Sequence, residues 1–132
     1  MQHELIIILD FGSQYTQLIA RRVREQGVYC EIVPFHYGIE KIVERNPKGV
    51  ILSGGPSSVY EEDAPLVSAD FYDKISTPIL GICYGMQLVT HLQGGEVEKA
   101  PHREFGRAEL TLDDRSDLFK GIGTGGPTVV WM

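Results

Sequence analysis

The first part of the chain alternates short apolar runs with amphipathic stretches. The run from Leu5 to Leu9 is continuously apolar, and further strand-like runs follow at 28–35, 49–52 and 78–80. Continuous runs rich in branched residues are typical of parallel strands that are buried on both faces. Between these runs, apolar residues recur three and four positions apart, as they do on one face of a helix. The pattern therefore predicts four strands separated by helices.

The predicted helices begin and end at residues with the matching preferences. Ser13 is expected to be the N-cap of the first helix, which Gly27 ends. A short helix is expected from Ile39 to about Asn46, a weaker one over 66–75, and a fourth after the turn at 81–83. Alternation of strand and helix predicts an α/β fold: an open, mostly parallel sheet with helices on both faces.

The pattern changes after residue 95. Segments 96–99 and 108–112 alternate polar and apolar residues, which predicts a small antiparallel β section. The final residues, 127–132, form another apolar, β-prone run with no cap or polar tail after it. We therefore expect residues 1–132 to form one domain that is truncated at its C-terminus.

Composition narrows the class of protein. A content of 42% hydrophobic and 23% charged residues is ordinary for a soluble globular domain. The net charge of −6 argues against a nucleic-acid partner and against an anionic membrane surface. The longest apolar run is far too short to cross a bilayer. With only two cysteines and no signal peptide, the expected compartment is the cytoplasm.

The strongest chemical signal is the segment from Gly81 to Gly85, which has the pattern G-x-C-x-G around Cys83. It follows a predicted strand and precedes a predicted helix, as in a nucleophile elbow with sulfur in place of the serine oxygen. A thiol at a helix N-terminus is stabilised as thiolate, which is the form that attacks carbonyl carbon. Cys83 is therefore the candidate nucleophile. Cys30 lies inside a predicted strand without flanking glycines, and we interpret it as core packing.

A thiolate that attacks an amide produces an oxyanion, which needs two hydrogen-bond donors nearby. In an elbow, one donor is the N–H of the residue after the nucleophile, here Tyr84. The loop Ser53-Gly54-Gly55-Pro56 can supply the second donor from Gly55 if the third and fourth strands are neighbours. A phosphate cradle and a plain tight turn are the alternatives for this loop, although it lacks the spacing and the lysine of a P-loop.

Two further residues are candidates for substrate contact. Gln87 lies four residues after Cys83, about one helical turn along the same face. Gly54, in the same loop as Gly55, is the second. The alternative for Gln87 is a solvated glutamine, and its spacing does not separate the two interpretations.

Together these motifs resemble class I glutamine amidotransferases. The resemblance is carried by Asp10-Phe11-Gly12-Ser13-Gln14-Tyr15, the Ser53–Pro56 loop and the elbow through Gln87, with Arg103-Glu104-Phe105-Gly106 as a further match. It implies a flavodoxin-like fold and hydrolysis of glutamine through a thioester on Cys83. Under it, Gly55 and Tyr84 hold the oxyanion while Gln87 and Gly54 contact the substrate, and this domain needs no metal or cofactor.

Within the family, the chain most resembles glutaminase domains that supply ammonia for the amination of XMP to GMP. This implies a synthetase domain of the ATP-pyrophosphatase type beyond residue 132 in the same chain, which uses ATP and magnesium to adenylate XMP. It also makes a homodimer through that missing part an expectation.

The resemblance further implies a triad completed by a His-x-Glu pair, a histidine and a glutamate separated by one residue, well downstream of the elbow. We expect residues 1–132 to lack both and to hydrolyse little glutamine alone. His91 lies eight residues past Cys83, about 12 Å along the helix, which exceeds hydrogen-bond reach. Nothing brings His3 or His36 near, and His102, in a predicted loop, stays open.

Two other functions remain open from the sequence. The chain could be a non-catalytic regulatory or binding module that keeps the elbow without a triad. It could also be a cysteine hydrolase of related architecture, or the glutaminase of another amidotransferase.

Overall fold

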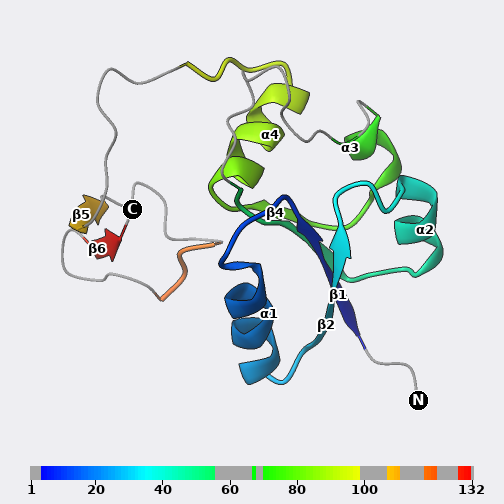
Figure 1. Ribbon diagram of the computed structural model, residues 1–132, viewed down its shortest axis with the longest axis horizontal. Helices are drawn as coiled ribbons and strands as arrows, with labels where there is room; N and C mark the ends of the chain where they lie inside the picture. The colour runs from blue at the N-terminus through cyan, green and yellow to red at the C-terminus, as the bar shows by residue number, and fades with distance from the viewer. Residues whose placement is uncertain are drawn as a thin grey trace. The chain divides into compact units, whose positions relative to one another are not determined.

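The computed structural model describes residues 4–55, 67, 70–98, 107–110, 118–121 and 128–131. The chain divides into two compact units, Met1–Glu98 and Lys99–Met132. Figure 1 shows the helices and strands of both units.

The first unit is built on a four-stranded parallel sheet. Its strands are β1 (Leu5–Asp10), β2 (Tyr29–Pro34), β3 (Gly49–Leu52) and β4 (Ile79–Gly81), in the order β2-β1-β3-β4. The register aligns Leu9 with Leu52 and Leu52 with Gly81. The carboxyl ends of β1, β3 and β4 therefore lie together at one edge of the sheet. This confirms the predicted parallel sheet, and it meets the condition that the third and fourth strands be neighbours.

Helices cover both faces of this sheet, as the sequence predicts (Figure 1). They are α1 (Thr16–Glu25), α2 (Ile39–Glu44), α3 (Phe71–Lys74) and α4 (Tyr84–Leu92). Because side chains alternate along a strand, β1 sends Ile8 to one face and Ile7 and Leu9 to the other. Ile8 packs with Ala20 of α1, whereas Ile7 and Leu9 pack with residues of the other three helices.

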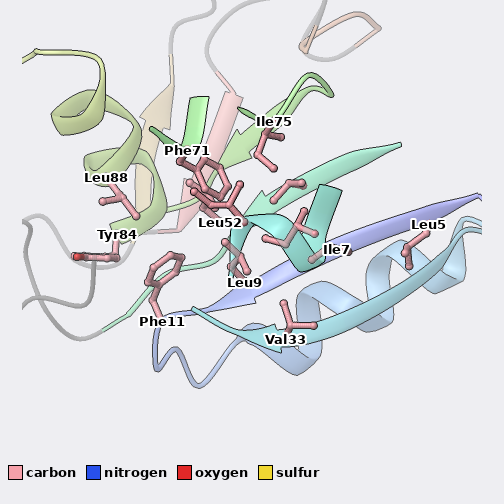
Figure 2. Close-up of a cluster of buried hydrophobic side chains, with 13 residues drawn as sticks. Leu5, Ile7, Leu9, Phe11, Val33, Leu52, Phe71, Ile75, Tyr84 and Leu88 are labelled. Atoms are coloured by element: carbon pink, nitrogen blue, oxygen red, sulfur yellow. The ribbon is translucent and has the colours of Figure 1, made fainter. Parts of the chain in front are cut away.

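The larger of the two cores holds most of the buried side chains (Figure 2). At one end of it, the ring centroids of Phe11 and Tyr84 lie 5.4 Å apart. Phe11 follows β1 and Tyr84 opens α4, so this contact ties the two strand ends together. In the smaller core, Cys30 is fully buried, and its Sγ donates to the carbonyl of Ala20 at 3.3 Å. The interpretation of Cys30 as core packing is confirmed.

Two helix boundaries differ from the prediction. Tyr15, not Ser13, occupies the N-cap of α1, and no side chain caps that helix. The Ser13 hydroxyl instead accepts the N–H of Tyr15 at 3.0 Å, a local serine turn that competes with capping. The helix expected over 66–75 is a single short helix, α3, in a stretch of which 66, 68 and 69 lie outside the described residues.

The second unit contains the antiparallel β section, but with a different pairing. Strand β5 (Arg107–Leu110) pairs with β6 (Thr128–Trp131). Residues 96–98, expected to be a strand, form none, and residue 99 lies outside the described part. Alternation shows that a strand is half-exposed, but it does not identify the partner. Across the residues that the structure describes, no helix is long and apolar enough to cross a membrane.

A buried hydroxyl in the first unit gives a stability prediction. Among the described residues, Thr77 Oγ1 is buried without a hydrogen-bond partner. Valine has nearly the same shape and no polar atom to desolvate. Thr77→Val is therefore expected to raise the free energy of unfolding of the protein by about 1 kcal/mol. Urea denaturation measures it, and a lower unfolding midpoint would show that the hydroxyl has a partner.

Candidate functional site

Cys83 sits at the junction between β4 and α4, as the elbow pattern predicts. Its backbone has φ 53° and ψ −113°, a region that residues with a Cβ rarely adopt. Such a conformation costs about 1–3 kcal/mol and persists only where the surroundings enforce it. The residue is exposed, so the sulfur is presented to solvent and not sealed in the core.

Two glycines make this turn possible, for steric reasons. A Cβ on Gly81 would lie 2.7 Å from the carbonyl oxygen of Gly85, and a Cβ on Gly85 would collide with the carbonyl of Leu52. The strand and the helix can therefore pass this closely only if both positions are glycine. The N–H of Ile82 donates to the carbonyl oxygen of Leu52 and that of Gly85 to the carbonyl oxygen of Ile82, both at 2.9 Å.

The residue after Cys83 is fixed by its side chain. Tyr84 is 1% exposed, and its ring packs against Phe11 (Figure 2). The phenol ring therefore anchors the first turn of α4 in the core, and the main chain of Tyr84 follows directly after the nucleophile. The same turn places Cys83 at the N-terminus of α4, the positive end of the helix dipole.

The Gly54–Gly55 loop leaves β3 beside the elbow. A Cβ on Gly54 would lie 3.1 Å from the Cβ of Cys83 and 3.7 Å from the hydroxyl of Ser13. A Cβ on Gly55 would run into the carbonyl oxygen of Phe11. Pairing of β3 with β4 brings this loop beside Cys83. Pro56, Ser57 and Ser58 lie outside the described residues.

Gln87 lies in the first turn of α4. It is half-buried, and its N–H donates to the carbonyl of Cys83 at 3.2 Å. Gln87 is therefore not fully exposed to solvent, which the alternative of a solvated glutamine would require. Met86, which the sequence interpretation did not single out, is 60% exposed immediately before it.

The sequence interpretation also passed over the support of the glycine loop. Ser53 and Thr16 are buried polar residues, and their hydroxyl oxygens lie 3.2 Å apart. Asp10 lies within 3.2 Å of the same Thr16 hydroxyl. Ser53 follows a buried strand directly, and a polar residue at such a position is the signal that could have identified it.

The sequence contains a histidine–glutamate pair with the spacing of the triad. His102-Arg103-Glu104 is itself a histidine and a glutamate separated by one residue, the spacing that the resemblance implies for the triad. The expectation that residues 1–132 lack such a pair was wrong for this sequence. These three residues lie outside the described part, so their distance to Cys83 is not assigned. His91 is on the exposed side of α4.

A separate cavity of about 260 Å³ lies beside α2 and α3. Its lining includes His36, Glu40 and Asp70 but neither the elbow nor the glycine loop. Lys74 lies 3.0 Å from the Asp70 carboxylate and 3.5 Å from that of Glu40, and these contacts raise the pKa of Lys74. Within the described ranges, no three His, Cys, Asp or Glu side chains gather closely enough to hold a metal ion.

Known proteins resemble the chain over almost its whole length. Residues 7–131 match the family model of class-I glutamine amidotransferases. The GMP synthase [glutamine-hydrolyzing] of Fusobacterium nucleatum is 60% identical over 128 residues, which cover 96% of this chain and 24% of that protein. The enzyme of the same name from Wolinella succinogenes is 59% identical over 131 residues, covering 96% and 25%.

A third relative with that name, from Caldicellulosiruptor saccharolyticus, is 54% identical over all 132 residues and 25% of its own length. The chain thus spans about a quarter of the length of these relatives.

A solved structure agrees with the fold. The crystal structure of a Thermoplasma acidophilum protein that bears the name of a GMP synthase component superposes with a TM-score of 0.86 at 32% sequence identity. The match covers 99% of this chain and 64% of that one. The elbow, the parallel sheet and the family match over residues 7–131 all support the same family assignment. This chain belongs to the class-I glutamine amidotransferase family.

Proposed function

We propose that the chain is the glutamine-hydrolysing part of a GMP synthase. The observation that carries this proposal is an exposed cysteine held at positive φ between a strand and a helix, with a glycine loop beside it. The name shared by relatives at 54–60% identity supports the choice among amidotransferases.

The reaction begins when the Cys83 thiolate attacks the side-chain carboxamide carbon of glutamine. A C–S bond forms and the carbonyl π electrons move to oxygen, giving a tetrahedral oxyanion. The C–N bond then breaks, the nitrogen leaves as ammonia after gaining a proton from a general acid, and a thioester remains. Water adds to the thioester, the C–S bond breaks, and glutamate and the free thiol are released. We assign the general acid to no residue of the described part.

In this proposal the oxyanion is held by two backbone donors, the N–H groups of Gly55 and Tyr84. The positions of these two residues support the assignment, because Tyr84 follows Cys83 directly and the Gly54–Gly55 loop lies against Cys83. Main-chain donors fixed by packing stabilise the developing charge without reorganising, which makes them effective in catalysis. Gln87, one turn along α4 from Cys83, and Gly54, in the loop beside it, contact the substrate.

The ammonia is passed to a synthetase domain that aminates XMP to GMP with ATP and magnesium. We place that domain in the same polypeptide, because the relatives that share the name are about four times longer than this chain. We also propose a cytoplasmic enzyme that dimerises through its synthetase part. Purified full-length polypeptide tests the proposal: it should release glutamate from glutamine and form GMP from XMP. Failure to release glutamate would favour the non-catalytic module.

Gly55→Ala tests the oxyanion role. The added Cβ would collide with the Phe11 carbonyl, so the loop must shift and displace the Gly55 N–H. We expect kcat for glutamine hydrolysis by the full-length polypeptide to fall about 100-fold, the usual effect of losing one oxyanion donor.

Alkylation of Cys83 by iodoacetamide, a substitution that forms no oxyanion, should proceed at the wild-type rate in this variant. Gly38→Ala is a control for glycine-to-alanine strain away from the proposed site: Gly38 lies at the start of α2 with φ +106°, which strains an alanine although a Cβ there meets nothing within 4 Å. If Gly55→Ala keeps the wild-type kcat, the Gly55 N–H is not a donor.

A further inference from the structure

The support beneath the glycine loop is a buried serine. Ser53 follows β3 directly and is 0% exposed. Its Oγ lies 3.4 Å from the N–H nitrogen of Phe11, 3.2 Å from the Thr16 hydroxyl and 3.3 Å from the carbonyl oxygen of Gly54. A buried hydroxyl with three polar neighbours is specified by its surroundings, because leaving one unsatisfied costs about 1–3 kcal/mol.

Counting protons shows which way the Ser53 hydroxyl donates. Thr16 has one hydroxyl proton and two acceptors, Asp10 Oδ1 and Ser53 Oγ, both at 3.2 Å. A carboxylate is the stronger acceptor, so the Thr16 proton goes to Asp10. Ser53 Oγ accepts the Phe11 N–H and keeps its own proton to donate. Two acceptors lie within reach of that proton, Thr16 Oγ1 at 3.2 Å and the carbonyl oxygen of Gly54 at 3.3 Å. We take the Gly54 carbonyl as its acceptor, because an amide carbonyl oxygen is a stronger acceptor than a hydroxyl oxygen.

That carbonyl belongs to the same peptide group as the proposed oxyanion donor. The C=O of Gly54 and the N–H of Gly55 share one planar unit, and no peptide bond of the described residues is cis. In a trans peptide the two groups point in opposite directions. A hydrogen bond that holds the Gly54 carbonyl toward buried Ser53 therefore turns the Gly55 N–H away from the serine.

A peptide between two glycines has little steric resistance to rotation. If this one rotated by half a turn, a carbonyl oxygen would replace the N–H at the site. It would repel the oxyanion that the N–H would stabilise. The loop therefore needs a restraint from outside its own backbone.

We propose that Ser53 is a positioning residue that holds the Gly54–Gly55 peptide in the orientation in which the Gly55 N–H serves the oxyanion. The inference rests on the proposed glutaminase function. It assigns to Ser53 no contact with substrate, only control of the peptide that makes one.

Ser53→Ala in the full-length polypeptide is the test. We expect kcat for glutamine hydrolysis to fall about 10- to 100-fold, because the donor is misoriented for much of the time but not removed. The KM for glutamine should change less than about threefold, since ground-state binding does not use the oxyanion donor. The rate of Cys83 alkylation by iodoacetamide should stay at the wild-type value, because the elbow is intact.

A second readout targets the oxyanion directly. The Cys83 thiolate adds to the aldehyde carbon of the inhibitor glutamate γ-semialdehyde. The aldehyde oxygen then lies where the oxyanion forms in the reaction. The inhibition constant of this aldehyde should rise by the same factor as kcat falls. Ser53→Thr, which keeps the hydroxyl, should restore most of the activity, and Thr77→Val serves as the control for loss of a buried hydroxyl elsewhere. If Ser53→Ala does not fold, Ser53→Cys, of similar size and with a weaker donor, takes its place.

The outcomes separate the two proposals. A wild-type polypeptide that releases no glutamate contradicts the proposed function and this inference with it. An active wild type with an unchanged kcat in Ser53→Ala overturns the inference alone. A parallel loss of kcat and of iodoacetamide alkylation also overturns it, because Ser53 would then support the elbow and not the oxyanion peptide.

Discussion

Replacing Cys83 by alanine in the full-length polypeptide is expected to lower the rate of glutamine hydrolysis at least about 10⁴-fold. Without the sulfur no thioester forms, and the backbone donors and substrate contacts that remain give only a small fraction of the catalysis. Cys83 is exposed at the elbow, so its side chain can be shortened with little loss of packing. Release of glutamate, measured against time at saturating glutamine, gives the rate.

The chain supplies a matched control for this variant. Cys30→Ala removes the other thiol, which is buried against Ala20 on the far face of the sheet, and should lower stability while keeping glutaminase activity. When ammonia is supplied in place of glutamine, the Cys83→Ala polypeptide should still aminate XMP, which shows that it is folded. Glutamine hydrolysis by Cys83→Ala at about a tenth of the wild-type rate or more would exclude the thioester route, given the loss expected without a nucleophile.

Replacing Gly85 by alanine is expected to lower the free energy of unfolding by at least about 3 kcal/mol. The new Cβ would overlap the backbone carbonyl of Leu52, which is fixed because it accepts the N–H of Ile82. Overpacking against a side chain typically costs about 1–3 kcal/mol, and backbone in a sheet yields less than a side chain. Urea denaturation of the full-length polypeptide measures the loss.

Gly27→Ala is the matched control. Gly27 has φ +76° and open space around its Cβ position, so the substitution carries only a backbone penalty of about 1–2 kcal/mol. Gly85 lies inside α4, where alanine would otherwise be favoured over glycine. If Gly85→Ala is no more destabilising than Gly27→Ala, β3 and α4 are not in the close contact that the elbow requires.

Much of the first unit could be predicted because its signals are local. The apolar run from Leu5 to Leu9 predicts a strand buried on both faces, and β1 is covered on both. Gly81 and Gly85 predict a tight turn around Cys83, and both glycines have the backbone neighbours that require them. Gly55 lies at the same sheet edge as Cys83 because β3 and β4 are neighbours, which the sequence left as a condition.

Other features depend on contacts that a local pattern does not contain. The partner of β5 is β6, distant in sequence, and the alternation in 108–112 fits any partner. Ser13 has the preferences of an N-cap, but its hydroxyl accepts the N–H of Tyr15, and Tyr15 is the residue at the N-cap of α1. Ser53 carries no motif of its own beside two glycines. The positioning role proposed for Ser53 rests on its burial and on the contacts of its hydroxyl with Phe11, Thr16 and Gly54, which a local sequence pattern does not contain.

The proposed function depends on attack of the Cys83 sulfur on the carboxamide of glutamine. A glutamine analogue that carries a diazo-ketone in place of the carboxamide tests it most directly, with mass spectrometry of the digested full-length polypeptide. The account predicts one label per chain, on Cys83, with a labelling rate that falls as glutamine is added. Labelling of other cysteines while Cys83 stays unmodified would contradict it.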